Sequence, residues 1–162
     1  MSRDLPVPKE VKDLLEELLG RSVMVGLTDP MHAADVTRTL VAVYKDNNNE
    51  LSAVVGLDFE LTAYVGAAIG LIPAGGAEAC IEDNEISKMI GENAIEVCNI
   101  LGGFLSRKGG THLKLHGTFL PGDRPPTDAV GYLLAVGRRI DLTVDIGGYG
   151  SGRLSFAYAG SL

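Results

Sequence analysis

The sequence predicts an α+β domain of layered α/β type, in which a largely antiparallel or mixed sheet packs against two long helices. Two pairs of alternating, β-branched segments are each joined by turn-forming residues, which indicates hairpins. Segments with apolar residues at helical spacing separate these pairs, and the strict strand–helix–strand alternation of a parallel sheet does not occur. With 162 residues, the chain can bury one sizeable core, so we expect residues 1–162 to form a single domain.

The N-terminal half is expected to begin with a helix that ends at Gly20. Its apolar residues share one face, and glycine is a common C-cap. A short strand follows and is broken at Pro30. The three asparagines of the DNNNE segment tolerate positive φ and favour a hairpin turn. The expected elements are a helix over residues 9–20, a strand over 22–27, a connection over 32–35 and a hairpin of strands 37–45 and 51–57.

The C-terminal part is expected to contain both long helices and a second hairpin. Asp58 is placed to cap the first long helix, and Asp83 or Asn84 to cap the second, which Gly109 and Gly110 would end. The expected elements are helices over 59–72 and 83–108 with a loop over 73–79 between them, a strand over 111–119, a loop over 121–126, an apolar run over 130–136 of undecided type, and a hairpin of 139–146 and 153–159. A helix followed by strands therefore occurs at 9–57 and again at 83–159, which fits a duplicated helix-plus-hairpin unit.

Composition excludes several classes of function. A net charge of −7 and a pI of 4.9 oppose binding to nucleic acid or to anionic lipid. The longest apolar run, residues 61–74, contains glycines and is too short to span a bilayer. The N-terminus has no apolar signal-peptide core, so we expect a cytoplasmic protein. Cys80 and Cys98 form neither a metal-binding pair nor a disulfide framework and are interpreted as small buried hydrophobes.

The predicted helix over 83–108 carries the candidate chemistry. Glu92, Glu96 and Asn99 fall at i, i+4 and i+7, on a different face from the apolar residues. Gly103 shares this polar face, where a missing side chain would let another molecule approach closely. An E-x-x-N pattern is weak alone, because this composition yields about 0.4 occurrences by chance. A solvated outer face is the alternative interpretation.

The same segment carries a family resemblance. EISKMIGENAIEVCNILGGFL resembles the signature helix of the CheC/CheX/FliY family of bacterial chemotaxis phosphatases, and CheX in particular. The family pattern is Asp or Ser, three residues, Glu, two residues, Asn, about 22 residues and then Pro. Glu96, Asn99 and Pro121 match it, whereas Glu92 takes the Asp or Ser position and departs in residue type.

The resemblance implies hydrolysis of the aspartyl-phosphate of a CheY-type response regulator. The divalent metal, Mg²⁺, is expected in the regulator, and no cofactor is expected on this chain. Asn99 is expected to orient the attacking water, because a carboxamide can accept a hydrogen bond from water and donate one to a phosphoryl oxygen without adding repulsive charge. Glu96 is expected to hold the regulator through a lysine, Glu92 to add attraction and Gly103 to leave room for the regulator's loop. CheX proteins pair through their sheets, so a homodimer is also implied.

The resemblance implies one E-x-x-N site in this chain. FliY and most CheC proteins have a second E-x-x-N in the first helix, where this chain has Glu16 and Glu17 followed by Leu19 and Gly20. One site is the CheX arrangement.

Two other functions fit the same residues. One is a noncatalytic module that binds a response regulator or belongs to the flagellar switch, like the FliM middle domain. The other is a structural domain whose E-x-x-N is accidental. His112 and His116 share a strand face without a third ligand, so no metal site is expected. GGYGSG lies between two strands and is interpreted as a hairpin turn.

Overall fold

The structure is a computed structural model that describes residues 4–159. Within these residues six strands form one sheet in the order β1-β5-β6-β3-β2-β4, and all neighbours are antiparallel. The strands are β1 (Val23–Leu27), β2 (Thr39–Lys45), β3 (Leu51–Asp58), β4 (Lys114–Phe119), β5 (Arg139–Ile146) and β6 (Gly150–Tyr158). The predicted α+β fold and both predicted hairpins are confirmed.

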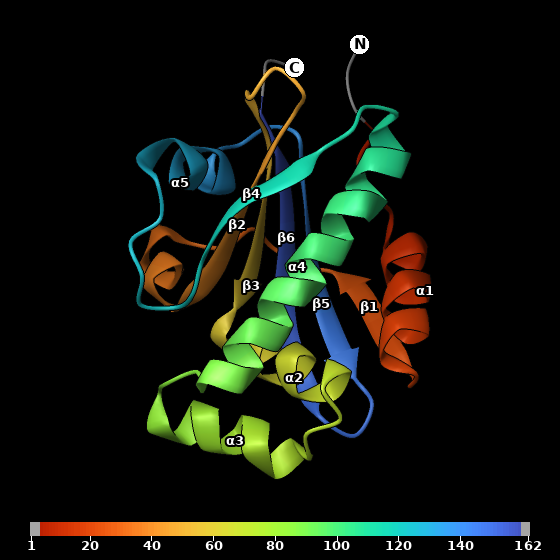
Figure 1. Ribbon diagram of the computed structural model, residues 1–162, viewed down its shortest axis with the longest axis vertical. Coiled ribbons are helices and arrows are strands. Elements are labelled where there is room, and N and C mark those ends of the chain that lie inside the picture. The colour runs from red at the N-terminus through yellow and green to blue at the C-terminus, as the bar shows by residue number, and fades with distance from the viewer. Residues whose placement is uncertain (1–3, 160–162) are drawn as a thin grey trace.

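Helices pack on both faces of the sheet (Figure 1). One face carries α1 (Pro8–Leu19), α2 (Phe59–Ile69) and α4 (Lys88–Gly109), and α4 crosses the sheet diagonally. The other face carries the 3₁₀ helix η1 (Ala33–Arg38) and α5 (Thr127–Leu134), while α3 (Ala74–Asp83) lies beside the first turns of α4. No helix in the described part of the chain is long and apolar enough to cross a membrane.

The central strands are buried on both faces. Alternate side chains of a strand point to opposite faces, so Ala42 and Tyr44 of β2 join the core under α1, α2 and α4. Val41 and Val43 join a second core with Leu133 of α5. Burial on both sides explains why β2 is almost continuously apolar.

The helix expected over 83–108 begins later than expected, because Asp83 is the last residue of α3 and α4 starts at Lys88, so that prediction is wrong at its start. The expected loop over 73–79 instead begins α3. Asn84 ends α3 with a left-handed φ of 55°, and its N–H is bonded to the carbonyls of Cys80 and Ile81. Ser87 then caps α4, because its hydroxyl accepts the N–H of Ile90 at 3.4 Å. Neither Asp83 nor Asn84 caps the long helix.

Smaller differences concern the ends of elements. The helix expected over 59–72 ends at Ile69, where Gly70 is its C-cap and Leu71 has a φ of 57°. α4 is therefore the only long helix among the described residues. Residues 33–35 of the expected connection belong to η1, the run of undecided type contributes to α5, β2 and β4 begin later than expected, and β6 begins earlier, at Gly150.

The predicted duplication is visible in the topology. Exchanging β1, β2 and β3 for β4, β5 and β6 converts the strand order of the sheet into its own reverse. In each half a helix leads into the edge strand, α1 into β1 and α4 into β4. Both helices end at a left-handed glycine, Gly20 with φ 67° and Gly110 with φ 73°.

Candidate functional site

The outer face of α4 presents all four predicted site residues. Val97, Leu101 and Leu105 are buried at helical spacing and hold the helix on the sheet. The opposite positions, Glu92, Glu96, Asn99 and Gly103, are exposed. They follow one another at intervals of three or four residues, so they form one stripe along the helix.

Two contacts fix the middle of α4 beneath this stripe. The buried hydroxyl of Tyr44 donates a hydrogen bond of 2.6 Å to the carbonyl of Cys98, the residue before Asn99. The Tyr44 ring also lies against Gly102, where a Cβ would stand 3.3 Å from Cε2. The turn that presents Asn99 is therefore bonded directly to β2.

The two helix glycines have different roles. Gly102 is buried, and the Tyr44 ring explains the absence of a side chain there. Gly103 is exposed, and an added Cβ would meet only the Arg107 guanidinium, at 3.6 Å. The space above Gly103 is therefore open, as the predicted contact with a partner's loop requires.

The N-terminal half of α4 is fixed by α2. Asn93 Nδ2 donates to the carbonyl of Gly66 at 2.9 Å. At Gly66 a Cβ would stand only 2.4 Å from the carbonyl oxygen of Ile90, so the two helices pack backbone to backbone. The position of Glu92 is consequently determined by the α2–α4 contact.

A shallow hollow of about 370 Å³ lies between α4 and the strand that follows it. We call it the α4–β4 hollow. Its lining residues are Asn99, Gly102, Gly103, Ser106, His112, Leu113, Lys114 and Leu115. Asn99 and Gly103 are thus at its border, together with His112 and Lys114, which the motif did not indicate.

Ser106 is unsuited to be a nucleophile in this hollow. Its hydroxyl accepts the N–H of Leu113 at 2.8 Å and lies within hydrogen-bonding distance of two carbonyl oxygens, those of Gly102 (2.8 Å) and Leu113 (3.1 Å). The group is therefore engaged in joining α4 to β4.

The acidic and amide side chains of the stripe are not engaged within the chain. Among residues 4–159, no hydrogen bond or ion pair involves the side chain of Glu92, Glu96 or Asn99. Other polar groups nearby are satisfied internally, as Asn93 is. The exposed carboxylates and carboxamide are thus available to a second molecule.

Other parts of the molecule offer less reactive groups. A hollow of about 210 Å³ is lined by Arg38, Asp58 and Arg153 among others, but Arg38 is paired with Glu60 and Arg153 donates to the carbonyl of Asp29. Burial raises the pKa of Asp58, which caps α2 by accepting the N–H of Leu61. No group of three or more histidine, cysteine or acidic side chains in the described residues is arranged to hold a metal ion.

The folds of solved proteins resemble this arrangement. The FliM middle domain of Helicobacter pylori matches with a TM-score of 0.59 and 10% identity, over 93% of this chain and 84% of that one. CheX in the CheX–CheY–BeF₃–Mg²⁺ complex of Borrelia burgdorferi matches with a TM-score of 0.55 and 12% identity, over 94% of both chains. FliY of Thermotoga maritima matches with a TM-score of 0.50 and 15% identity, over 96% and 93%. No protein-family model and no curated protein sequence matches.

The chain has the CheC/CheX/FliY fold. The resemblance inferred from the signature helix is therefore confirmed at the level of fold.

Within this CheX-like fold, the internal duplication locates the position of a second site. Gly110 is 90 positions after Gly20, and each glycine is the C-cap of its helix. Likewise, the hydroxyl of Ser106 accepts the N–H of Leu113, and the carboxylate of Glu16 accepts the N–H of Val23. Both residues of the second pair lie 90 positions before their counterparts in the first. This spacing makes Pro6 and Lys9 the counterparts of Glu96 and Asn99. The second motif is thus absent, and its position is at the start of α1, upstream of the Glu16–Gly20 segment.

Proposed function

We propose that this chain is a cytoplasmic protein phosphatase that hydrolyses the aspartyl-phosphate of a CheY-type response regulator. The observation that carries the proposal is that Glu96 and Asn99 stand one turn apart, exposed and unengaged, on a helix whose backbone is bonded to the sheet beneath them. When the regulator already holds its metal ion beside the phosphoryl group, the phosphatase mainly has to supply groups in fixed positions, as Glu96 and Asn99 are.

The reaction would need little chemistry from this chain. The Asn99 carboxamide oxygen accepts a hydrogen bond from a water molecule while its nitrogen donates to a phosphoryl oxygen. The water oxygen attacks phosphorus, and the bond from phosphorus to the aspartyl oxygen breaks. Aspartate and inorganic phosphate are formed, and the proton lost by the water passes to phosphate or solvent. The divalent cation, expected to be Mg²⁺, belongs to the regulator.

Glu96 is better suited to binding than to proton abstraction. A carboxylate facing a phosphoryl group would be repelled by it, whereas an exposed carboxylate beside it can pair with a lysine of the partner. Glu92, one turn earlier, adds negative charge to the same contact. Gly103 leaves room for a loop of the regulator on the far side of Asn99.

Substitution separates these roles. With a CheY-type regulator phosphorylated by acetyl phosphate, Asn99→Ala should remove the stimulated loss of phosphate and leave binding of the beryllofluoride form nearly unchanged. Glu96→Ala should weaken that binding. Matched controls are Asn47→Ala, exposed in the β2–β3 turn, and Glu17→Ala, exposed on α1. Wild-type turnover in the Asn99→Ala protein would contradict the proposal.

A noncatalytic module of the flagellar-switch type is the second candidate. The FliM middle domain shares this fold with a TM-score of 0.59, against 0.55 for CheX. The phosphate-loss assay discriminates the two functions, because a noncatalytic module would bind the regulator without shortening the lifetime of its phosphate.

We also propose a homodimer that forms through β1. Edge strands with unpaired backbone groups can pair with another chain. At one edge β4 is interrupted by a register shift opposite Val43 and Tyr44 and carries Lys114 and His116, features that discourage pairing. At the other edge β1 has no charged residue, and Met24 and Leu27 are 71% and 72% exposed. Sedimentation equilibrium of wild type and Leu27→Lys would test this, with a shift to monomer expected in the variant.

A further inference from the structure

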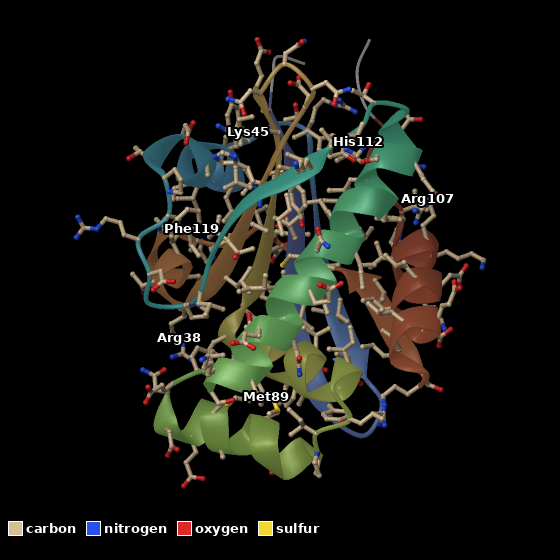
Figure 2. All side chains as sticks on the ribbon, in the orientation of Figure 1. Arg38, Lys45, Met89, Arg107, His112 and Phe119 are labelled. Carbon is tan, nitrogen blue, oxygen red and sulfur yellow. The ribbon has the colours of Figure 1, made fainter. Side chains whose placement is uncertain are left out.

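The exposed face of α4 has an ordered sequence of chemical groups from one end to the other. It begins at Met89, continues through Glu92 and Glu96 to Asn99 and Gly103, and ends at Arg107. At about 1.5 Å per residue, this face extends for about 27 Å. Figure 2 shows Met89 near one end of α4 and Arg107 and His112 near the other. We call these six residues the α4 face.

Met89 is the apolar end of the α4 face. Its side chain is 64% exposed, although most large apolar residues of α4 are buried. Methionine is adaptable and is enriched where proteins bind one another. An exposed methionine three residues from Glu92 therefore provides an apolar contact beside the acidic ones.

The acidic part of the face is not neutralised by its own helix. Lys88 precedes Glu92 by four residues, yet no ion pair joins them. Glu92 and Glu96 thus present two carboxylates to a partner.

Arg107 is the cationic end. Its Nη1 lies 3.6 Å from the Cβ position of Gly103, so the guanidinium folds back along the helix toward the open glycine. In the described residues it makes no ion pair or hydrogen bond, whereas its neighbour Lys108 pairs with Glu10 at 3.1 Å. Lys114, across the α4–β4 hollow, adds a second exposed cation near this end.

From this order we infer that the α4 face fixes the orientation of a docked phosphorylated receiver domain. This inference rests on the proposed function. The partner's basic and apolar contacts lie against Glu92, Glu96 and Met89, and an acidic rim of its phosphorylation pocket lies against Arg107 and Lys114. The rim is acidic because hard divalent cations are held by carboxylates. Asn99 stands between the two halves, where the phosphoryl group lies.

Two charge or polarity changes, one at each end, test this orientation. Met89→Asp and Arg107→Glu are compared with Val136→Asp, a fully exposed apolar residue after α5, and Arg124→Glu, an exposed arginine between β4 and α5. The measurement is titration of the beryllofluoride form of a CheY-type regulator at low and moderate salt, with thermal melting to verify folding. We expect about tenfold weaker binding for each α4 variant, a reduced salt dependence for Arg107→Glu, and little change in the controls.

The docking inference and the phosphatase proposal can fail independently, because binding of the regulator tests the first and loss of its phosphate tests the second. Met89→Asp or Arg107→Glu binding as tightly as its control would overturn the docking inference, even if the wild type removes phosphate. A wild type that binds the regulator and leaves its phosphate in place would overturn the phosphatase proposal alone. In that case the loss of binding in both α4 variants would still support the docking surface.

Discussion

Tyr44 and Cys98 are joined by a buried hydrogen bond of 2.6 Å, from the phenol hydroxyl of β2 to a helix carbonyl of α4. Since Cys98 immediately precedes Asn99, this bond connects the proposed water-orienting residue to the sheet. Tyr44 therefore both stabilises the fold and positions Asn99, because its ring also fills the space left by the missing side chain of Gly102.

Tyr44→Phe should remove this hydrogen bond and little else. We expect the free energy of unfolding to fall by about 1 kcal/mol, measured by urea titration, and phosphate-loss activity to fall with it at a temperature where the variant remains folded. Tyr132→Phe is the control, because no hydrogen bond of the Tyr132 hydroxyl is found in the described residues. Equal stability of wild type and Tyr44→Phe would show that the bond contributes nothing.

Gly102→Ala and Gly103→Ala should have different effects. Alanine at either position gains helix propensity of about 1 kcal/mol. At Gly103 nothing but a flexible guanidinium is close, so this variant should unfold at higher urea concentration than wild type. At Gly102 the Tyr44 ring stands 3.3 Å from the new methyl group and must shift, so the gain should be lost. A Gly102→Ala protein as stable as Gly103→Ala would contradict the packing described here.

Asp141 should make folding sensitive to acid. It is 5% exposed and accepts hydrogen bonds from Arg139 at 2.8 and 2.9 Å and from Ser155 at 2.7 Å. Burial acts to raise the pKa of Asp141, but the bonds from Arg139 and Ser155 outweigh it, so the pKa lies below its ordinary value. The stabilisation is therefore complete above about pH 4 and is lost as the pH falls through the folded-state pKa.

Asp141→Asn tests this account. Because the buried Arg139 loses its charge partner, we expect about 3 kcal/mol lower stability at neutral pH and a flatter dependence of stability on pH between pH 5 and 3. Asp145→Asn, on the same strand and exposed, is the control and should leave both quantities nearly unchanged. Urea titrations across this pH range provide the measurement, and parallel curves for wild type and Asp141→Asn would refute the prediction.

The cysteines should be unreactive in the folded protein. Cys98 is completely buried, and burial raises the pKa of its thiol to about 12, while Cys80 is 5% exposed. Since the thiolate is the reactive form, a thiol-specific chromogenic reagent at mildly alkaline pH should give almost no signal until denaturant is added. Rapid labelling of Cys98 in the native protein would show that α4 opens readily near Asn99.

Local signals predicted most of the fold. Gly20 and Gly110 both end helices where a C-cap glycine was expected, and Asp58 caps α2 as predicted. The alternation of residues 139–146 predicted β5 with the same bounds. These features depend on a few neighbouring residues, which is why sequence alone was sufficient.

The differences arise where two weak signals competed. Asp83, Asn84 and Ser87 are all residue types that favour an N-cap, and the expected cap was Asp83 or Asn84, whereas Asn84 ends α3 and Ser87 begins α4. At Gly103 helical spacing indicated an open position on the polar face, but no such signal was available for Gly102. The contact of Gly102 with Tyr44, 58 residues earlier, could not be predicted, because it depends on tertiary packing.

The site was predictable only in part. The stripe from Glu92 to Gly103 follows from helical spacing, and all four residues are exposed as expected. The additional contribution of His112 and Lys114 depends on β4 returning beside α4, which no local pattern specifies. The unpaired state of Arg107, next to a paired Lys108, likewise depends on where α1 lies.

The near-symmetry of the two halves has a consequence for engineering. Because α1 starts at Pro8, two residues after the counterpart of Glu96, the first half lacks the helical turns that would present a second motif. Extending α1 toward the N-terminus, with Pro6→Glu and Lys9→Asn, would place the E-x-x-N pattern in the first half of the chain. Such a chain would carry two E-x-x-N motifs, one on the helix before each edge strand of the sheet.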